Sequence, residues 1–160
     1  MVAATKSVRD GLACYERDSV LFYEPAVSHH LFSWLMYALS REKSGLCVMD
    51  FGGSLGSAYF QHRHLLAHIK SLRWGVVEQA HFVDIGREEF ESAVLRFFAS
   101  TEECIESIRP NFGLFSGVLQ YLENPHERID SWLGLGLPYL LIDKTLVHSS
   151  GHDRLVVQHV

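Results

Sequence analysis

The sequence of 160 residues lacks the features that mark membrane-spanning, secreted and disulfide-bonded chains. Its longest apolar stretch, residues 31–39, is interrupted by Ser33 and is far shorter than the ~18 residues of a membrane span. The N-terminus, MVAATKSVRDG, has no apolar core of a secretory signal. The three cysteines are odd in number and form no CxxC pair. We therefore expect reduced thiols and a cytoplasmic location.

The chain also lacks an excess of positive charge. Fourteen Lys and Arg stand against nineteen Asp and Glu, which gives a net charge of −5 with no basic block. A duplex-binding protein needs a basic face to neutralise phosphates, and a membrane-surface helix needs a Lys- and Arg-rich face. We therefore expect neither a nucleic-acid nor a membrane partner. The hydrophobic share of 48% excludes a disordered chain and fits one globular domain.

What the sequence does contain is an alternation of short apolar runs with helical patterns. The runs predict strands at 46–49, 73–77, 94–98, 112–115 and 138–142, and the intervening patterns predict helices at 57–72, 82–90, 102–108 and 125–133. Such alternation is typical of parallel βαβ units, in which ligands bind at the carboxyl ends of the strands. The predicted fold class is α/β with a mostly parallel, Rossmann-like sheet in a single domain over 1–160.

The sequence also predicts how the two ends of this domain are organised. Residues 1–45 are expected to form a helical cap on an α/β core at 46–160, with 6–22 helical in part. A second cap helix is expected to run from Pro25 to a C-cap at Gly45. At the other end, 154–160 is predicted to be a strand with no closing helix after it. We expect this strand to be an edge or the sheet to be shorter than its full fold, and a homodimer partner is one way to cover the edge.

A glycine-rich turn, Gly52-Gly-Ser-Leu-Gly56, stands between the first strand of the core and the next helix. It has neither the spacing nor the lysine of a P-loop, and Ser54 occupies the second glycine position of a dinucleotide fingerprint. Asp50, two residues earlier, would repel a pyrophosphate but suits a ligand with an ammonium group. S-adenosylmethionine (SAM) is such a ligand, and Glu78 at the end of the second strand could accept its ribose hydroxyls.

These residues carry a resemblance. Val48-Met-Asp-Phe-Gly-Gly-Ser-Leu-Gly56 resembles motif I of class I SAM-dependent methyltransferases, with Ser54 for the usual middle glycine. The whole chain resembles a largely uncharacterised bacterial family of such enzymes, often associated with surface-polysaccharide gene clusters. The matching stretches, in order, are 15–18, 50–61, 74–79, 115–125, 141–145 and 153–158.

The resemblance implies roles for individual residues. Asp50, Gly52, Gly53, Ser54 and Gly56 would surround the methionine part of the cofactor, and Glu78 would hold the ribose. Ser100 and Thr101 would lie near the adenine, where many relatives have an acid and this chain has none before Glu102. Ser116 and Leu119 would line the floor of the pocket, and Gln120 and Tyr121 the substrate side. The family also continues beyond this C-terminus, so the resemblance implies a C-terminally truncated sheet.

Several residues leave two interpretations open. Tyr121 is either a substrate contact or part of a buried helix face, whereas the Gln120 amide needs a partner and favours a functional role. Residues 15–18 form either a solvated helix with local ion pairs or a lid over the cofactor. His62, His64 and His68 favour a solvated helix face over a metal site, and no metal is expected. The sequence around Ser54 misses the GxSxG elbow of a hydrolase by one residue.

The function favoured by these features is transfer of a methyl group from SAM to a small-molecule or glycan-type acceptor. No general base is assigned, although His29, His30 and Tyr121 are candidates. The alternative is a non-catalytic SAM-binding domain that acts as a sensor or scaffold. A nicotinamide-dependent oxidoreductase is disfavoured by Ser54 and by Asp50.

Overall fold

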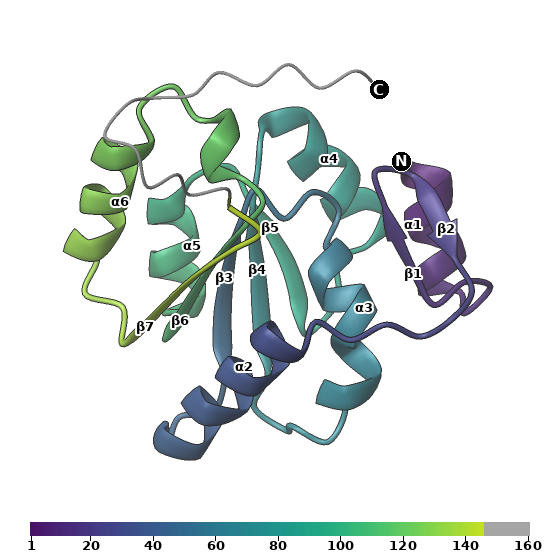
Figure 1. Ribbon diagram of the computed structural model, residues 1–160, viewed down its shortest axis with the longest axis horizontal. Helices are drawn as coiled ribbons and strands as arrows, with labels where there is room; N and C mark the ends of the chain where they lie inside the picture. Colours follow the sequence, from purple (N-terminus) through teal and green to yellow (C-terminus); the bar gives the residue numbers. More distant parts are fainter. Residues whose placement is uncertain (146–160) are drawn as a thin grey trace.

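The computed structural model describes residues 1–145, so the strand predicted at 154–160 lies outside the described residues. At the centre is a five-stranded sheet in which every neighbouring pair is parallel, in the order β5-β4-β3-β6-β7 (Figure 1). The strands are β3 (Cys47–Phe51), β4 (Arg73–Val77), β5 (Leu95–Phe98), β6 (Phe112–Ser116) and β7 (Tyr139–Asp143). The predicted α/β class with a parallel sheet is confirmed, and this strand order is Rossmann-like.

Helices cover both faces of the sheet and create two apolar cores. One core joins the sheet to α2 (His29–Arg41), α3 (Ser57–Leu66) and α4 (Ala80–Glu89). The other joins it to α5 (Thr101–Ile108), the 3₁₀ turn η1 (Leu119–Tyr121) and α6 (Pro125–Gly134). In Figure 1, α5 and α6 lie to the left of β3 and β4, whereas α3 and α4 lie to the right.

The strands form because their apolar residues are buried on both faces. Along β4, Trp74 and Val76 enter the first core, whereas Val77 enters the second. This alternation follows from the two-residue period of a strand, and the resulting continuous apolar run is typical of a parallel sheet covered on both sides. The positions of strand ends are therefore set by where the apolar run stops.

The N-terminal segment differs from its prediction. It consists of α1 (Val2–Arg9) and an antiparallel hairpin of β1 (Tyr15–Arg17) and β2 (Val20–Phe22). The prediction that 6–22 is helical in part therefore holds for residues 6–9, whereas the 1–45 cap is not purely helical. Asp18 and Ser19 both have positive φ, 49° and 71°, as the two central residues of a tight hairpin turn require. Tyr15 and Phe22 stack across the strands at 4.5 Å.

Two helices are also shorter than predicted. α2 begins at His29 rather than Pro25 and has its C-cap at Glu42 rather than Gly45. α3 ends at Leu66 rather than Leu72. Ile69 and Leu72 are nevertheless buried, from the turns that follow α3. The apolar pattern at positions 69 and 72 therefore reflects burial of these side chains in the core and does not mean that α3 continues.

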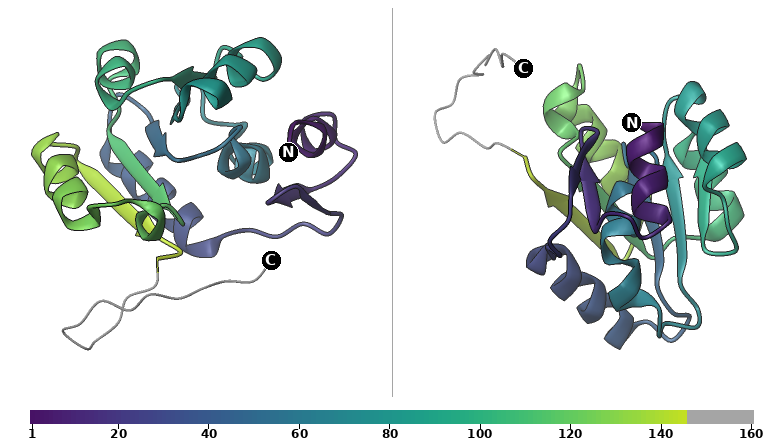
Figure 2. Two further views of the ribbon diagram at one scale, coloured as in Figure 1. Left: turned by 90° about the horizontal axis from the view of Figure 1, so that it is seen from above. Right: turned by 90° about the vertical axis from the view of Figure 1, so that its right-hand side faces the viewer.

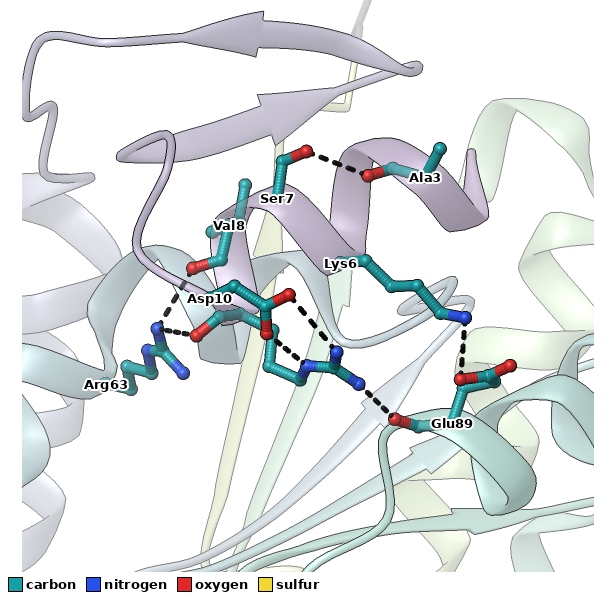
Figure 3. Close-up of polar contacts among 8 residues, drawn as sticks. Ala3, Lys6, Ser7, Val8, Asp10, Arg63 and Glu89 are labelled. Carbon is teal, nitrogen blue, oxygen red and sulfur yellow. Dashed lines mark hydrogen bonds and ion pairs between the residues drawn. The ribbon is translucent and has the colours of Figure 1, made fainter.

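Figure 3 shows how α1 is attached to α3 and α4, two of the helices that cover the sheet. Arg63 of α3 donates to the carbonyl oxygens of Val8 and Arg9, at 2.9 and 2.6 Å. Arg9 in turn donates to the Glu89 carbonyl at 2.8 Å, and Lys6 forms an ion pair with the Glu89 carboxylate. These bonds join α1 to α3 and α4 across more than fifty residues of sequence.

Figure 2 shows the same arrangement from two further sides, with α1 and the hairpin beside α3 and away from α6. The packing of Val8 with Phe60 and Phe90 in the first core continues the sheet's core into this N-terminal segment. Within residues 1–145, no helix combines the length and the apolar character needed to cross a membrane.

Candidate functional site

A cleft lies at the carboxyl ends of the strands, at the point where the chain order reverses. From β3 the chain runs to β4 and then to β5, which lie on one side of β3 within the sheet. It then returns to β6, which pairs with the other edge of β3. In open α/β sheets ligands bind at such a switch point. The cleft has a volume of about 610 Å³, within the range of small-molecule sites. It is lined by Phe51, Gly52, Val77, Glu78, Gln79, Ala99, Ser100, Thr101, Glu102, Gly117, Val118, Tyr121, Leu122 and Arg128.

The glycine loop between β3 and α3 forms one side of this region. Gly52 and Gly56 have φ values of 70° and 87°, which favour glycine, and Ser54 adopts 56°. A Cβ atom on Gly52 would lie 2.6 Å from Val118 Cγ2, so the loop approaches the β6 turn too closely for a side chain. Of the loop residues predicted to bind a cofactor, Gly52 lines the cleft directly, and Gly53, Ser54 and Gly56 shape the turn behind it.

Glu78 lies in the cleft and is oriented by backbone groups. The Ser54 amide donates to Oε1 at 3.2 Å, and the Gln79 amide donates to Oε2 at 2.9 Å. A carboxylate has about four lone-pair sites, so each oxygen keeps acceptor capacity beyond these bonds. Glu78 is therefore held next to the glycine loop with free capacity to accept hydroxyl groups from a ligand.

Asp50 occupies a different place from the one that the sequence suggested. Its carboxylate is buried, 2% exposed, on the α3 side of the sheet beneath the loop, and it does not line the cleft. Trp74 Nε1 donates to Oδ2 at 3.0 Å. Burial raises the pKa of Asp50 to about 7, an effect that the Trp74 bond opposes and the Glu78 charge reinforces. A Cβ on Gly53 would lie 2.6 Å from this carboxylate, so Asp50 supports the loop from below.

The N-terminal segment contacts the loop through Met1 and the start of α3 through the hairpin. Glu16 is buried, Ser57 Oγ at the start of α3 donates to its Oε1, and the Ser19 amide donates to Oε2 at 3.1 Å. Ser54 Oγ lies 3.0 Å from the Met1 sulfur. The interpretation of 15–18 as a solvated helix is therefore wrong, because the segment is a strand and Glu16 sits against the first turn of α3.

The residues predicted after β6 separate into two groups. Tyr121 is 76% exposed and lines the cleft. Gln120 does not line it, and its amide donates to the Gly117 carbonyl at 3.0 Å, so the partner that the amide needs lies in its own turn. Leu119 is buried in the second core, and Ser116 faces Asp143 with 3.5 Å between Oγ and Oδ2. Tyr121 is thus the one of these four that lines the cleft.

The far end of the cleft is formed by the turn between β5 and α5. Ser100 caps α5 by accepting from the Glu103 amide at 3.1 Å, and Ser100, Thr101 and Glu102 all line the cleft. Glu102 supplies the acid at this end of the cleft.

Sequence reasoning missed Arg128, which reaches the cleft from the first turns of α6. Its signal was its position shortly after Pro125, since the start of a helix that follows a parallel strand lies at the ligand-binding edge of the sheet.

Of the three histidines predicted on a solvated helix face, His64 and His68 are exposed and His62 is placed otherwise. His62 is buried; its Nε2 accepts from the Ser28 amide at 3.1 Å, and its Nδ1 lies 2.8 Å from the Ala58 carbonyl. The prediction of a solvated face is wrong for this residue, and burial lowers its pKa. His68 follows the end of α3. Within residues 1–145, no group of three or more His, Cys, Asp or Glu is arranged to hold a metal ion. His29 and His30 do not line the cleft.

The fold and the cleft define a Rossmann-like α/β protein with a candidate ligand site at the switch point of its sheet. Comparison of the chain with family models, with curated proteins and with solved structures finds no match. The function must therefore be argued from the geometry and charge of the cleft.

Proposed function

We propose that the protein is a SAM-dependent methyltransferase that acts on a small-molecule or glycan-type acceptor. The observation that carries this proposal is the pair of carboxylates that flank the glycine loop. Glu78 lies in the cleft on one side of the loop, and Glu16 is buried against the first turn of α3 on the other. The loop therefore meets its ligand between two negative charges.

This charge pattern separates two classes of ligand. In dinucleotide-binding folds the pyrophosphate sits at the N-terminus of the helix after the glycine loop. Here the Glu16 carboxylate already contacts that helix terminus at Ser57, and it would repel a second anion at short range. SAM carries no phosphate, and its ammonium and sulfonium cations outnumber its single carboxylate. The pattern therefore favours SAM over a nicotinamide dinucleotide.

The residues of the cleft fit the remaining parts of such a cofactor. Glu78 retains acceptor capacity for both ribose hydroxyls, and the turn at Ser100, Thr101 and Glu102 offers polar groups on the adenine side. When bound, SAM supplies an electrophilic methyl group. The protein's contribution would be to align the acceptor with that group and to exclude water, which accounts for much of the catalysis of a transfer between two bound reactants.

The direct experiment is calorimetric titration of the protein with SAM and with NADH. We expect SAM to bind, Glu78→Gln to weaken it at least about tenfold, equivalent to ~1.4 kcal/mol, and the exposed α4 variant Glu88→Gln to leave it unchanged. NADH should not bind. A well-folded protein that binds no SAM, or that binds NADH instead, would contradict the proposal.

A non-catalytic SAM-binding domain is the second candidate. The observation that favours it is the composition of the cleft, whose lining has no histidine, lysine or cysteine to act as a base within the described residues. Tyr121 is the only one of the three candidate bases in that lining. Release of S-adenosylhomocysteine when acceptors are offered separates the two functions, since a sensor binds SAM without producing it.

A further inference from the structure

The charged side chains of the cleft are separated into two ends. Glu78 follows β4 and Glu102 lies in the first turn of α5, which follows β5, so both acids belong to the side of the sheet beyond β3. Arg128 belongs to α6, which follows β6 on the opposite side, and it is the cation of the cleft lining. A ligand that fills the cleft would thus meet negative charge at one end and positive charge at the other.

Arg128 has no partner among the described residues. Some arginines elsewhere in the fold are held by specific contacts: Arg63 by carbonyl oxygens, Arg87 by Glu103 at 2.7 Å, and Arg96 by Ser107 at 2.9 Å. Within residues 1–145, no hydrogen bond or ion pair holds the Arg128 guanidinium. Its five N–H donors are therefore available to a ligand, in the planar fork that matches a carboxylate or a phosphate.

The surroundings of Arg128 also fit a ring-shaped polar ligand. Tyr121, 76% exposed, lines the same cleft. Arg128 further lines an adjoining hollow of about 290 Å³, together with Leu122, Glu123, Asn124, Glu127 and Ser131. Arg128 thus stands where the cleft meets a second recess, in which the Glu123 and Glu127 carboxylates can accept hydroxyl groups of a ligand and would repel an oxyanion placed away from the guanidinium.

We infer that Arg128 selects an acceptor bearing a carboxylate or a phosphate, so that the substrate class is an acidic sugar or a sugar phosphate. This inference rests on the proposed function, because it assigns the Glu78 end of the cleft to the cofactor and leaves the α6 end to the acceptor. Tyr121 would cover the face of the ring, and the guanidinium would bind the oxyanion bidentately. A neutral sugar would leave those donors without a charged partner.

The test measures binding of three probes, glucuronate, glucose 6-phosphate and glucose, to the full chain by ligand-observed NMR, with and without saturating S-adenosylhomocysteine. At least one anionic probe should bind about tenfold or more tightly than glucose, and the pair of anions tells carboxylate from phosphate selection. Arg128→Gln should remove that preference, and Arg128→Lys should retain part of it. The matched control, Arg109→Gln, changes an exposed arginine at the C-cap of α5 and should keep the preference.

Equal binding of all three probes, no measurable binding of either anion, or an unchanged preference in Arg128→Gln would each overturn the inference. The affinity for S-adenosylhomocysteine, measured on the same samples by calorimetry, distinguishes this result from failure of the proposed function. Arg128→Gln should leave that affinity unaltered. Loss of cofactor binding by the wild-type chain, with anion selection intact, would overturn the methyltransferase proposal and the acceptor role while leaving an anion site at Arg128.

Discussion

Asp50 and Glu78 stand at the ends of neighbouring strands, yet their environments are opposite. Asp50 still belongs to the hydrogen-bonded ladder, opposite Val76 on one side and Leu114 on the other, and its side chain enters the helix layer. Glu78 comes one residue after the last residue of β4 and turns over the edge into the cleft. An acid within the ladder becomes a structural group, and an acid just beyond it becomes a candidate ligand contact.

The largest effect expected from this difference concerns the partner of Asp50. Trp74→Phe removes the indole N–H that the buried carboxylate accepts and also leaves unfilled volume, so we expect a loss of about 3 kcal/mol in the free energy of unfolding. Trp34→Phe changes an indole that is 49% exposed and should cost less than about 1 kcal/mol. Urea denaturation of both variants measures the two values, and equal losses would mean that the bond to Asp50 contributes nothing.

The second effect is a dependence of stability on pH. The pKa of Asp50 is raised by burial to about 7, so the folded state binds its proton more tightly than the unfolded state, whose carboxyl titrates near 4. The contribution is favourable at low pH and is lost as pH rises through 7, with a slope of up to about 1.4 kcal/mol per pH unit. His62, whose pKa is lowered by burial, acts in the opposite direction as pH falls below about 6.5.

Asp50→Asn isolates the Asp50 contribution, because His62 is present in both proteins. Relative to wild type, this variant should gain about 2 kcal/mol of stability between pH 5 and pH 7. Glu78→Gln removes a charge that raises the pKa of Asp50, so the loss of stability in this variant should be complete at a lower pH than in wild type. Chemical denaturation at four or five pH values gives the curves, and parallel profiles for wild type and Asp50→Asn would refute the assignment.

The smallest effect concerns the loop between the two acids. Ser54 has φ of 56°, a conformation that costs an L-residue about 1 kcal/mol and glycine much less. We expect Ser54→Gly to stabilise the fold by ~0.5 kcal/mol after the greater freedom of the unfolded chain is counted. Ser40→Gly, within α2, should destabilise it by ~0.5–1 kcal/mol. Thermal unfolding of both variants in one buffer measures the two changes in stability. A loss of stability in Ser54→Gly would show that contacts of the serine outweigh its unfavourable backbone conformation.

Much of the sheet could be predicted because its strands are uninterrupted apolar runs. The prediction for 73–77 matches β4 at both ends, and the other four strands differ by one or two residues. The parallel direction of the strands followed from the alternation with helices. The positions of Glu78 and of the glycine loop followed as well, since both stand where an apolar run ends.

The orientation of individual side chains could not be predicted in the same way. Whether Asp50 or Glu78 faces the cleft depends on the last pairing of each strand, and sequence predicts element ends less well than element types. His62 accepts from the amide of Ser28, which lies 34 residues away, and the β1–β2 hairpin has strands of only three residues. Arg128 was missed because its position after Pro125 was the only signal, and a single charge on a helix does not stand out in the sequence.

The contact between Gly53 and Asp50 has a consequence for sequence change in homologues. Because a Cβ at position 53 would lie 2.6 Å from the Asp50 carboxylate, position 53 must stay glycine while Asp50 is present. Replacement of Asp50 by a smaller residue would make room for alanine or serine at position 53. A side chain at position 53 could not come first, because it would clash with the Asp50 carboxylate. Positions 50 and 53 should therefore be inherited as a pair, whereas Glu78 is free to change with the ligand.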